Sequence, residues 1–230
     1  MGLHMTIPRV ITIDGPAGSG KSTLGANLAT QLGYIYFDTG IMYRALTLAV
    51  IEVHCDPHDA VAVTRLAEQS EISVHAPTHD DGRQYTIMLN GRDVTWDIRQ
   101  QSVEKTVSIA AAHPSVRQIL RARQRAIGMQ GNVVMVGRDI GSIVIPEAPL
   151  KIYLDVSIAE RAHRRVAELT ARGESIDEAQ LTESIRVRDE RDSHVMQPAT
   201  DAVHINGDTD TPAQTLAYVL QLVANCPALR

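Results

Sequence analysis

Cysteine is scarce in this sequence of 230 residues, and its nine histidines form no metal-binding pattern. The two cysteines, Cys55 and Cys226, are far apart and make no C-x-x-C spacing, so neither a zinc site nor a disulfide framework is indicated. The histidines form no H-E-x-x-H motif or comparable cluster, which is the spacing that a zinc-binding helix needs. We therefore assign no histidine or cysteine as a metal ligand.

Long hydrophobic runs are also absent. No stretch of about 18 apolar residues occurs, as a membrane-spanning helix would require. Residues 1–5 do not open the apolar segment of a signal peptide, which would follow a positively charged start. We expect a cytoplasmic protein that does not associate with a membrane.

An excess of positive charge is missing as well. The formal net charge of −5 argues against a nucleic-acid polymer as the main partner. Of the 22 basic residues only three are lysine, namely Lys21, Lys105 and Lys151. A genome-wide codon bias and a need for forked guanidinium groups on phosphates both explain this preference for arginine, and both explanations stay open.

A glycine-rich loop is the most informative feature that the sequence does contain. It fits the G-x-x-x-x-G-K-[ST] pattern and lies between an apolar run at 10–13 and a helical pattern at 24–32, the context in which backbone N–H groups surround phosphate oxygens. Lys21 is then expected to reach the β and γ phosphates, and the Ser22 hydroxyl to bind Mg²⁺. We predict that the loop binds ATP or another nucleoside triphosphate through Gly15, Pro16, Ala17, Gly18, Ser19, Gly20, Lys21, Ser22 and Thr23.

Apolar runs alternate with helical patterns along the rest of the chain. Near-continuous apolar and β-branched runs of this length are typical of strands that are covered on both faces, and their alternation with helices predicts an α/β fold with a parallel sheet. We expect helices at 157–171 and 176–195, and a third that starts at Thr211-Pro212. The five predicted strands are 10–13, 34–37, 133–136, 151–156 and 202–205.

The second and third predicted strands are too far apart for one crossover, so we predict an inserted lobe. Asp81-Gly82 and Asn90-Gly91 supply the turn residues that hairpins need. The lobe is expected to hold a three-stranded antiparallel sheet. Its predicted elements are helices at 41–54 and 59–69 and strands at 71–75, 84–89 and 92–95.

Arginines follow three of the predicted sheet strands, at the edge where ligands of parallel sheets bind. A cluster of arginines beside a glycine loop is suited to several phosphates, because phosphoryl transfer depends on positioning and counter-charge. Arg161, Arg164 and Arg165 lie within about one helical turn, and we interpret their helix as a mobile lid that excludes water. Because of helical spacing, we expect Arg161 and Arg165 to point inward together and Arg164 to point elsewhere.

Taken together, several motifs resemble those of the bacterial cytidylate kinases, over nearly the whole chain. The motifs are the glycine loop and the segments 38–44, 137–141, 146–155, 160–165 and 188–192. The resemblance implies transfer of the γ-phosphoryl group of ATP to CMP or dCMP, with Mg²⁺ bound with ATP. It also implies a five-stranded parallel sheet in a single domain over 1–230, a monophosphate-binding insert at 39–112 and a lid at 157–173. We expect a monomer.

The resemblance also implies roles for individual residues. Thr39, where the family usually has serine, Arg44 and Arg138 match positions that contact the CMP phosphate. Ser108, Arg117 and Asp139 match positions that recognise cytosine. Arg188 and Asp192 match positions near the ribose and phosphate, and Arg99 matches an arginine at the exit of the insert. The expected catalytic residues are Lys21, Arg138, Arg161 and Arg165.

The chain departs from the family pattern at two positions. Val136 stands where the family commonly has an acidic residue before Gly-Arg-Asp, so Asp14 or Asp38 would have to order the metal shell. Val195 stands where the family often has an arginine, and Arg191 is the candidate to replace that contact. Other acceptors (UMP, AMP or shikimate) and a P-loop switch protein remain alternatives, although the N-K-x-D segment of guanine-reading switches is absent.

Overall fold

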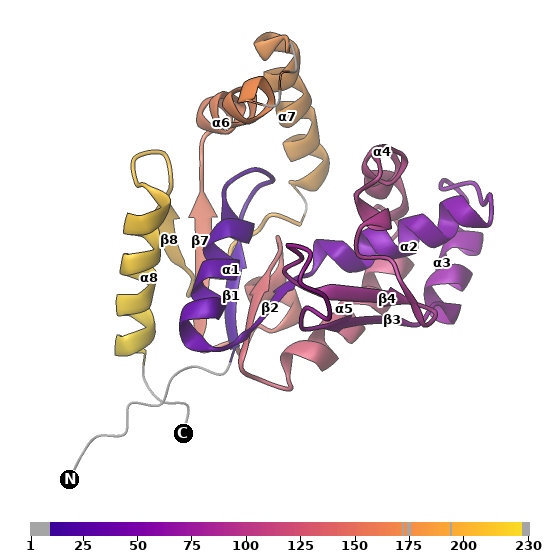
Figure 1. The fold of residues 1–230 in the computed structure, drawn as a ribbon, viewed down its shortest axis with the longest axis horizontal. Helices are drawn as coiled ribbons and strands as arrows, with labels where there is room; N and C mark the ends of the chain where they lie inside the picture. Colours follow the sequence, from indigo (N-terminus) through magenta and orange to yellow (C-terminus); the bar gives the residue numbers. More distant parts are fainter. Residues whose placement is uncertain (1–9, 172, 174–175, 194, 227–230) are drawn as a thin grey trace. The chain divides into compact units, whose positions relative to one another are not determined.

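The computed structural model describes residues 10–171, 173, 176–193 and 195–226. The chain divides into two compact units, one containing Met1–Tyr34 and Val134–Arg230, the other Ile35–Val133. The insert predicted at 39–112 lies within the second of these. Figure 1 shows the course of the chain through both units.

A five-stranded parallel sheet with the strand order β2-β6-β1-β7-β8 confirms the predicted fold class. Ile11 of β1 pairs with Leu150 of β7, and Ile152 of β7 pairs with Val203 of β8, both in parallel register. Every residue of β1 is buried, as expected for a strand covered on both faces. The strands are β1 (Val10–Asp14), β2 (Ile35–Asp38), β6 (Val133–Val136), β7 (Leu150–Asp155) and β8 (Val203–Asn206).

Helices α1 (Lys21–Leu32) and α8 (Pro212–Asn225) pack against each other in the first unit. Helix α1 lies between Gly20 and Gly33, which both have a left-handed backbone conformation. The predicted start of α8 is confirmed, because Thr211 and Gln214 form a reciprocal capping box and proline occupies the first turn.

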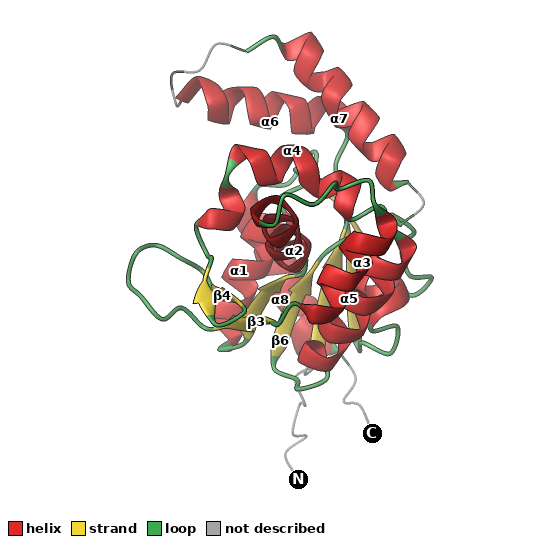
Figure 2. Cartoon of the chain, turned by 90° about the vertical axis from the view of Figure 1, so that its right-hand side faces the viewer, coloured by secondary structure: helices red, strands yellow, loops and turns green. Residues whose placement is uncertain are grey.

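Helices α6 (Ile158–Ala171) and α7 (Glu178–Asp192) lie side by side, as both Figure 1 and Figure 2 show. Helix α7 starts later than predicted because the Asp177 side chain accepts hydrogen bonds from two amides of its first turn. Residue 172 of the predicted lid and residue 194 of the predicted helix lie outside the described residues.

The second unit contains the predicted antiparallel sheet, β3-β4-β5. Asn90 and Gly91 adopt positive φ angles in the turn between β4 and β5, which confirms the predicted hairpin. Helix α4 was not predicted, although Val103, Val107 and Ala110 have the spacing of an apolar helix face, and Val103 and Ala110 are buried. The elements are α2 (Gly40–Glu52), α3 (Ala60–Gln69), β3 (Ile72–His75), β4 (Thr86–Leu89), β5 (Arg92–Asp93), a 3₁₀ turn at Asp97–Arg99, α4 (Gln101–Ala110) and α5 (Pro114–Gly128).

We predict that Gly15→Ala destabilises the protein far more than Gly33→Ala. A Cβ at position 15 would lie 2.3 Å from the backbone carbonyl oxygen of Leu154, on a backbone with φ of 148°, whereas a Cβ at position 33 would meet nothing within 4 Å. We expect a loss of about 3 kcal/mol or more in the free energy of unfolding for Gly15→Ala. For Gly33→Ala only the left-handed backbone is strained, at a cost of about 1 kcal/mol. Urea denaturation followed by circular dichroism measures both, and equal losses would contradict the steric argument.

Candidate nucleotide site

The glycine loop runs from the end of β1 to the start of α1. Gly15, Gly18 and Gly20 have φ angles of 148°, 78° and 92°, which L-residues with a side chain rarely adopt. The ammonium group of Lys21 donates to the Pro16 carbonyl and lies 3.4 Å from the Ser19 hydroxyl, so the side chain folds back over its own loop. Glycine amides and a lysine ammonium arranged in this way suit a bound polyphosphate.

Arg161, the first arginine of the predicted lid, lies against this loop. Its Nη1 donates to the Ala17 carbonyl at 3.0 Å, and its Nε donates to the Val156 carbonyl at 3.0 Å. The two Nη atoms contact the two carboxylate oxygens of Asp189 on α7. With 4% of its surface exposed, Arg161 is a buried charge that two carbonyls and a bidentate carboxylate compensate.

Arg164 and Arg165 are placed differently. Arg164 donates to Glu160 and to the Gly207 carbonyl, away from the loop as expected. Arg165 pairs with Glu168, and 47% of its side chain is exposed. The expectation that Arg161 and Arg165 point inward together is therefore corrected: a shared helix face sets the Cβ direction, but the long Arg165 side chain turns to a carboxylate within its own helix.

Three of the predicted acceptor residues in the first unit come together. Arg138, which follows β6, forms an ion pair with Asp192 at the end of α7. Arg188, one turn earlier, has its Nε 3.9 Å from the same Asp192 carboxylate. This places two guanidinium groups around one carboxylate. Val195, at the position where the family often has an arginine, is buried instead.

Asp14 ends β1 directly before the glycine loop, and its carboxylate holds the segment after β6. It accepts hydrogen bonds from the amides of Ile140 and Gly141, at 2.9 and 2.7 Å. Burial raises the pKa of Asp14 to about 6, against the lowering effect of these two amides, and the negative charge of Asp139 raises it further. Asp139 itself is 5% exposed.

In the second unit, the predicted acceptor residues are held by neighbours that the sequence gave no reason to select. Arg44 pairs with Glu104 of α4, and its Nη1 lies 3.5 Å from the Ile98 carbonyl. The guanidinium of Arg117 lies over the ring of Tyr43, 5.4 Å from its centroid. These contacts restrict the rotamers of Arg44 and Arg117 before any ligand binds.

Arg99 lies over the ring of Trp96, 4.6 Å from its centroid, and Trp96 is 44% exposed. Arg99 also interacts with the hydroxyl of Tyr85. Burial raises the pKa of that hydroxyl, and the hydrogen bond from Arg99 opposes the rise. An aromatic face and a hydroxyl thus fix this exposed guanidinium.

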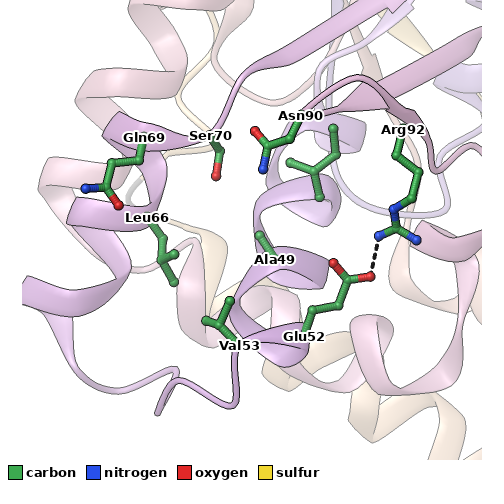
Figure 3. Close-up of a pocket in the computed structure, with 9 residues that line it drawn as sticks. Ala49, Glu52, Val53, Leu66, Gln69, Ser70, Asn90 and Arg92 are labelled. Atoms are coloured by element: carbon green, nitrogen blue, oxygen red, sulfur yellow. Dashed lines mark hydrogen bonds and ion pairs between the residues drawn. The ribbon is translucent and has the colours of Figure 1, made fainter.

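The remaining predicted residues of this unit lie on helices. Thr39 is buried directly before α2, and its carbonyl is 3.4 Å from the side-chain nitrogen of the buried Gln124. Ser108 is exposed on α4. A cavity of about 400 Å³ opens elsewhere in the unit, beside the Arg92–Glu52 ion pair, as Figure 3 shows. None of the predicted acceptor residues is among those that line it.

The residues around the loop fit a Mg²⁺ ion that arrives with a nucleotide. Ser22 is exposed in the first turn of α1, and hydroxyl oxygen is a ligand that Mg²⁺ accepts. Among the described residues, no group of three or more His, Cys, Asp or Glu side chains could hold a metal ion. Asp14 is engaged with two amides and Asp38 accepts from the Gly40 amide. One protein hydroxyl plus phosphate oxygens is the kind of ligand set that Mg²⁺ uses.

Across the part of the chain that the structure describes, no helix has the length and apolar composition of a membrane span. The parallel sheet, the glycine loop between β1 and α1 and the buried Arg161 against that loop place the chain in the class of P-loop kinases.

Comparison with known proteins identifies the family. The family model for cytidylate kinase matches residues 11–225. A cytidylate kinase of Roseiflexus castenholzii is 54% identical over 222 residues, which cover 96% of both chains, and one of Chloroflexus aggregans is 53% identical with 94% coverage of both. Among solved structures, a shikimate kinase from Bacteroides thetaiotaomicron aligns with a TM-score of 0.48 at 15% identity, covering 93% of this chain and 95% of that one. The chain belongs to the cytidylate kinase family, and its activity is that of a nucleoside monophosphate kinase.

We predict that Asp14→Asn removes a pH dependence of stability. The folded-state pKa is about 6 against a reference of 3.8, so between these values the folded state binds more protons than the unfolded state. The contribution of Asp14 to stability therefore falls as the pH rises from about 4 to 6, by on the order of 3 kcal/mol. Urea denaturation of both proteins from pH 4 to 7 should show the stability difference shifting in favour of the variant across this window. A difference that does not change with pH would contradict the prediction.

Proposed function

We propose that this chain transfers the γ-phosphoryl group of ATP to CMP or dCMP, giving ADP and CDP or dCDP. The observation that carries the proposal is the glycine loop, with Lys21 folded over it and the buried Arg161 against it. A cytoplasmic location and a monomeric state stay predictions from the sequence.

The donor half of the reaction is assigned to the loop and to α1. The backbone N–H groups of the segment from Gly15 to Thr23 bind the phosphates of ATP, except at Pro16, which has no N–H and only shapes the loop. Lys21 compensates the negative charge that develops during transfer. Ser22 would help to hold Mg²⁺, which neutralises charge on the β and γ phosphates when bound. Arg161, which contacts the same loop, supplies a further positive charge beside the phosphates. The exposed Arg165 would have to break its ion pair with Glu168 to reach a phosphate.

The acceptor half is assigned to the residues that the family resemblance selects. Arg138, Arg44 and Thr39 bind the acceptor phosphate, since guanidinium groups form bidentate contacts with phosphate. Arg188 and Asp192 bind the ribose and phosphate region, and Arg99 supplies a further positive charge. The base is assigned to Asp139, Arg117 and Ser108.

Cytosine recognition follows from its hydrogen-bond pattern. Cytosine has an amino donor at N4 and acceptors at N3 and O2, whereas uracil has an acceptor at O4 and a donor at N3. A carboxylate such as Asp139 can accept from N4, and a guanidinium such as Arg117 can donate toward N3 and O2. A site of buried polar groups rejects the other base strongly, because these groups would be left unpaired.

A panel of acceptors tests the proposal directly. ADP release is measured with CMP, dCMP, UMP, AMP, shikimate and no acceptor, with Lys21→Ala as a control against contaminating kinases. We expect fast release with CMP or dCMP and a loss on the order of 100-fold for Lys21→Ala, since one preorganised contact to transition-state charge is worth roughly 3 kcal/mol. Acceptor-independent hydrolysis would favour a switch protein instead, and a preference for another acceptor would overturn the assignment.

We predict that Asp139→Ala narrows the preference for CMP over UMP. Removing the carboxylate that accepts from N4 should lower kcat/KM for CMP far more than for UMP, by at least about tenfold or roughly 1.4 kcal/mol. If Asp139 instead orients Arg138, both substrates fall together and the ratio stays constant. Steady-state kinetics of both proteins with both acceptors distinguishes the two roles.

A further inference from the structure

Helix α7 has an unusual basis for its position. None of its residues is buried, so its placement does not come from an apolar face inserted into a core. Its acidic residues do contact the rest of the first unit: Asp189 forms a bidentate pair with Arg161, and Asp192 pairs with Arg138. Being three residues apart, Asp189 and Asp192 lie on one face of the helix.

The Asp189 contact reaches the glycine loop through one side chain. The same Nη1 atom of Arg161 that contacts Asp189 at 3.1 Å also donates to the Ala17 carbonyl at 3.0 Å. A Cβ at Gly18 would lie 3.9 Å from Cβ and Cδ of Arg161, so the stem of this arginine packs alongside the loop as well. The orientation of the guanidinium therefore affects the backbone that binds phosphate.

Because Arg161 is buried, its hydrogen bond to Ala17 depends on the Asp189 carboxylate. Arg161 is 4% exposed and the Asp189 side chain is 18% exposed. A buried guanidinium without its carboxylate keeps a desolvated charge and turns toward another acceptor or toward water. Each of these movements would release the hydrogen bond to Ala17.

From this geometry, we propose that Asp189 is a positioning residue for the donor site: it holds Arg161 against the Ala17 carbonyl and thereby fixes the loop for ATP. The proposal rests on the proposed function only in naming ATP as the donor. Because Asp192 of the same helix pairs with Arg138, a residue assigned to the acceptor, α7 links the two ligand sites of the first unit. Acceptor binding at Arg138 is therefore expected to change the affinity for ATP through this link, and the effect is reciprocal.

The test compares Asp189→Asn with Glu190→Gln, a matched change on the same helix. Glu190 is exposed and pairs with Arg186, so its variant should behave as wild type. Calorimetry measures binding of a non-hydrolysable ATP analogue with Mg²⁺, and of CMP, each alone and with the other ligand present. For Asp189→Asn we expect analogue binding to weaken by about tenfold or more, CMP binding alone to stay within twofold, and the effect of each ligand on the affinity for the other to be lost. Asp189→Glu should restore part of the analogue affinity.

A double variant keeps the test valid if Asp189→Asn folds poorly. Arg161→Met with Asp189→Asn removes both charges, so no uncompensated charge is left buried. If Asp189 acts through Arg161, the double variant binds the analogue within about twofold of Arg161→Met alone. Losses that add in the double variant, equal losses of analogue and CMP affinity, or wild-type analogue affinity in Asp189→Asn would each overturn the proposal. A wild-type protein without CMP-dependent ADP release would instead overturn the proposed function, while the analogue data still decide the role of Asp189.

Discussion

The structure around the glycine loop depends on how the buried charge of Arg161 is compensated. Taking a guanidinium out of water is costly unless hydrogen bonds and an opposite charge replace its hydration. Here the replacement comes from three separate segments: the carbonyl of Val156 at the end of β7, the carbonyl of Ala17 in the glycine loop, and Asp189 on α7. Satisfying this one charge therefore fixes the loop, the start of α6 and the second helix of the pair relative to one another.

Asp14 is a second buried charge next to the glycine loop, and like Arg161 it holds a neighbouring segment in place through hydrogen bonds. The Asp14 carboxylate accepts hydrogen bonds from two amides of the segment that follows β6. Asp139 belongs to that segment, and its negative charge raises the pKa of Asp14. Val136, the position at which the family resemblance predicts an acid, is buried at the end of β6. An additional carboxylate there would add negative charge near Asp14 and Asp139. The absence of that acid thus lowers the electrostatic cost of keeping two buried carboxylates beside the loop.

The fold was largely predictable from the sequence, because the strands of the parallel sheet are short, mostly apolar runs and the glycine loop has a fixed spacing. Pairings between side chains that are distant in the sequence were not predictable. The segment 186–192 reads as an exposed helical face with local pairs, and Arg186 does pair locally with Glu183 and Glu190. Nothing in that pattern separates Asp189, which meets Arg161 28 residues away. The sequence also did not predict that Glu104 pairs with Arg44 or that Tyr43 lies under Arg117. Both contacts depend on how helices pack, which hydrophobic periodicity does not specify.

The arginines of the second unit show why such partners matter for ligand binding. A long arginine side chain loses rotamer freedom when it binds a phosphate, and this loss weakens binding. Glu104 holds Arg44, and the rings of Tyr43 and Trp96 lie under Arg117 and Arg99. The aromatic partners can stay in place while the guanidinium edge binds a ligand, because a ring occupies only the face of the group. Glu104, by contrast, engages Nη2 of Arg44, one of the donors that a bidentate contact with a phosphate would use. Under the proposed function, Arg44 would exchange or share its carboxylate on acceptor binding, whereas the rings that lie under Arg117 and Arg99 already restrict those two side chains.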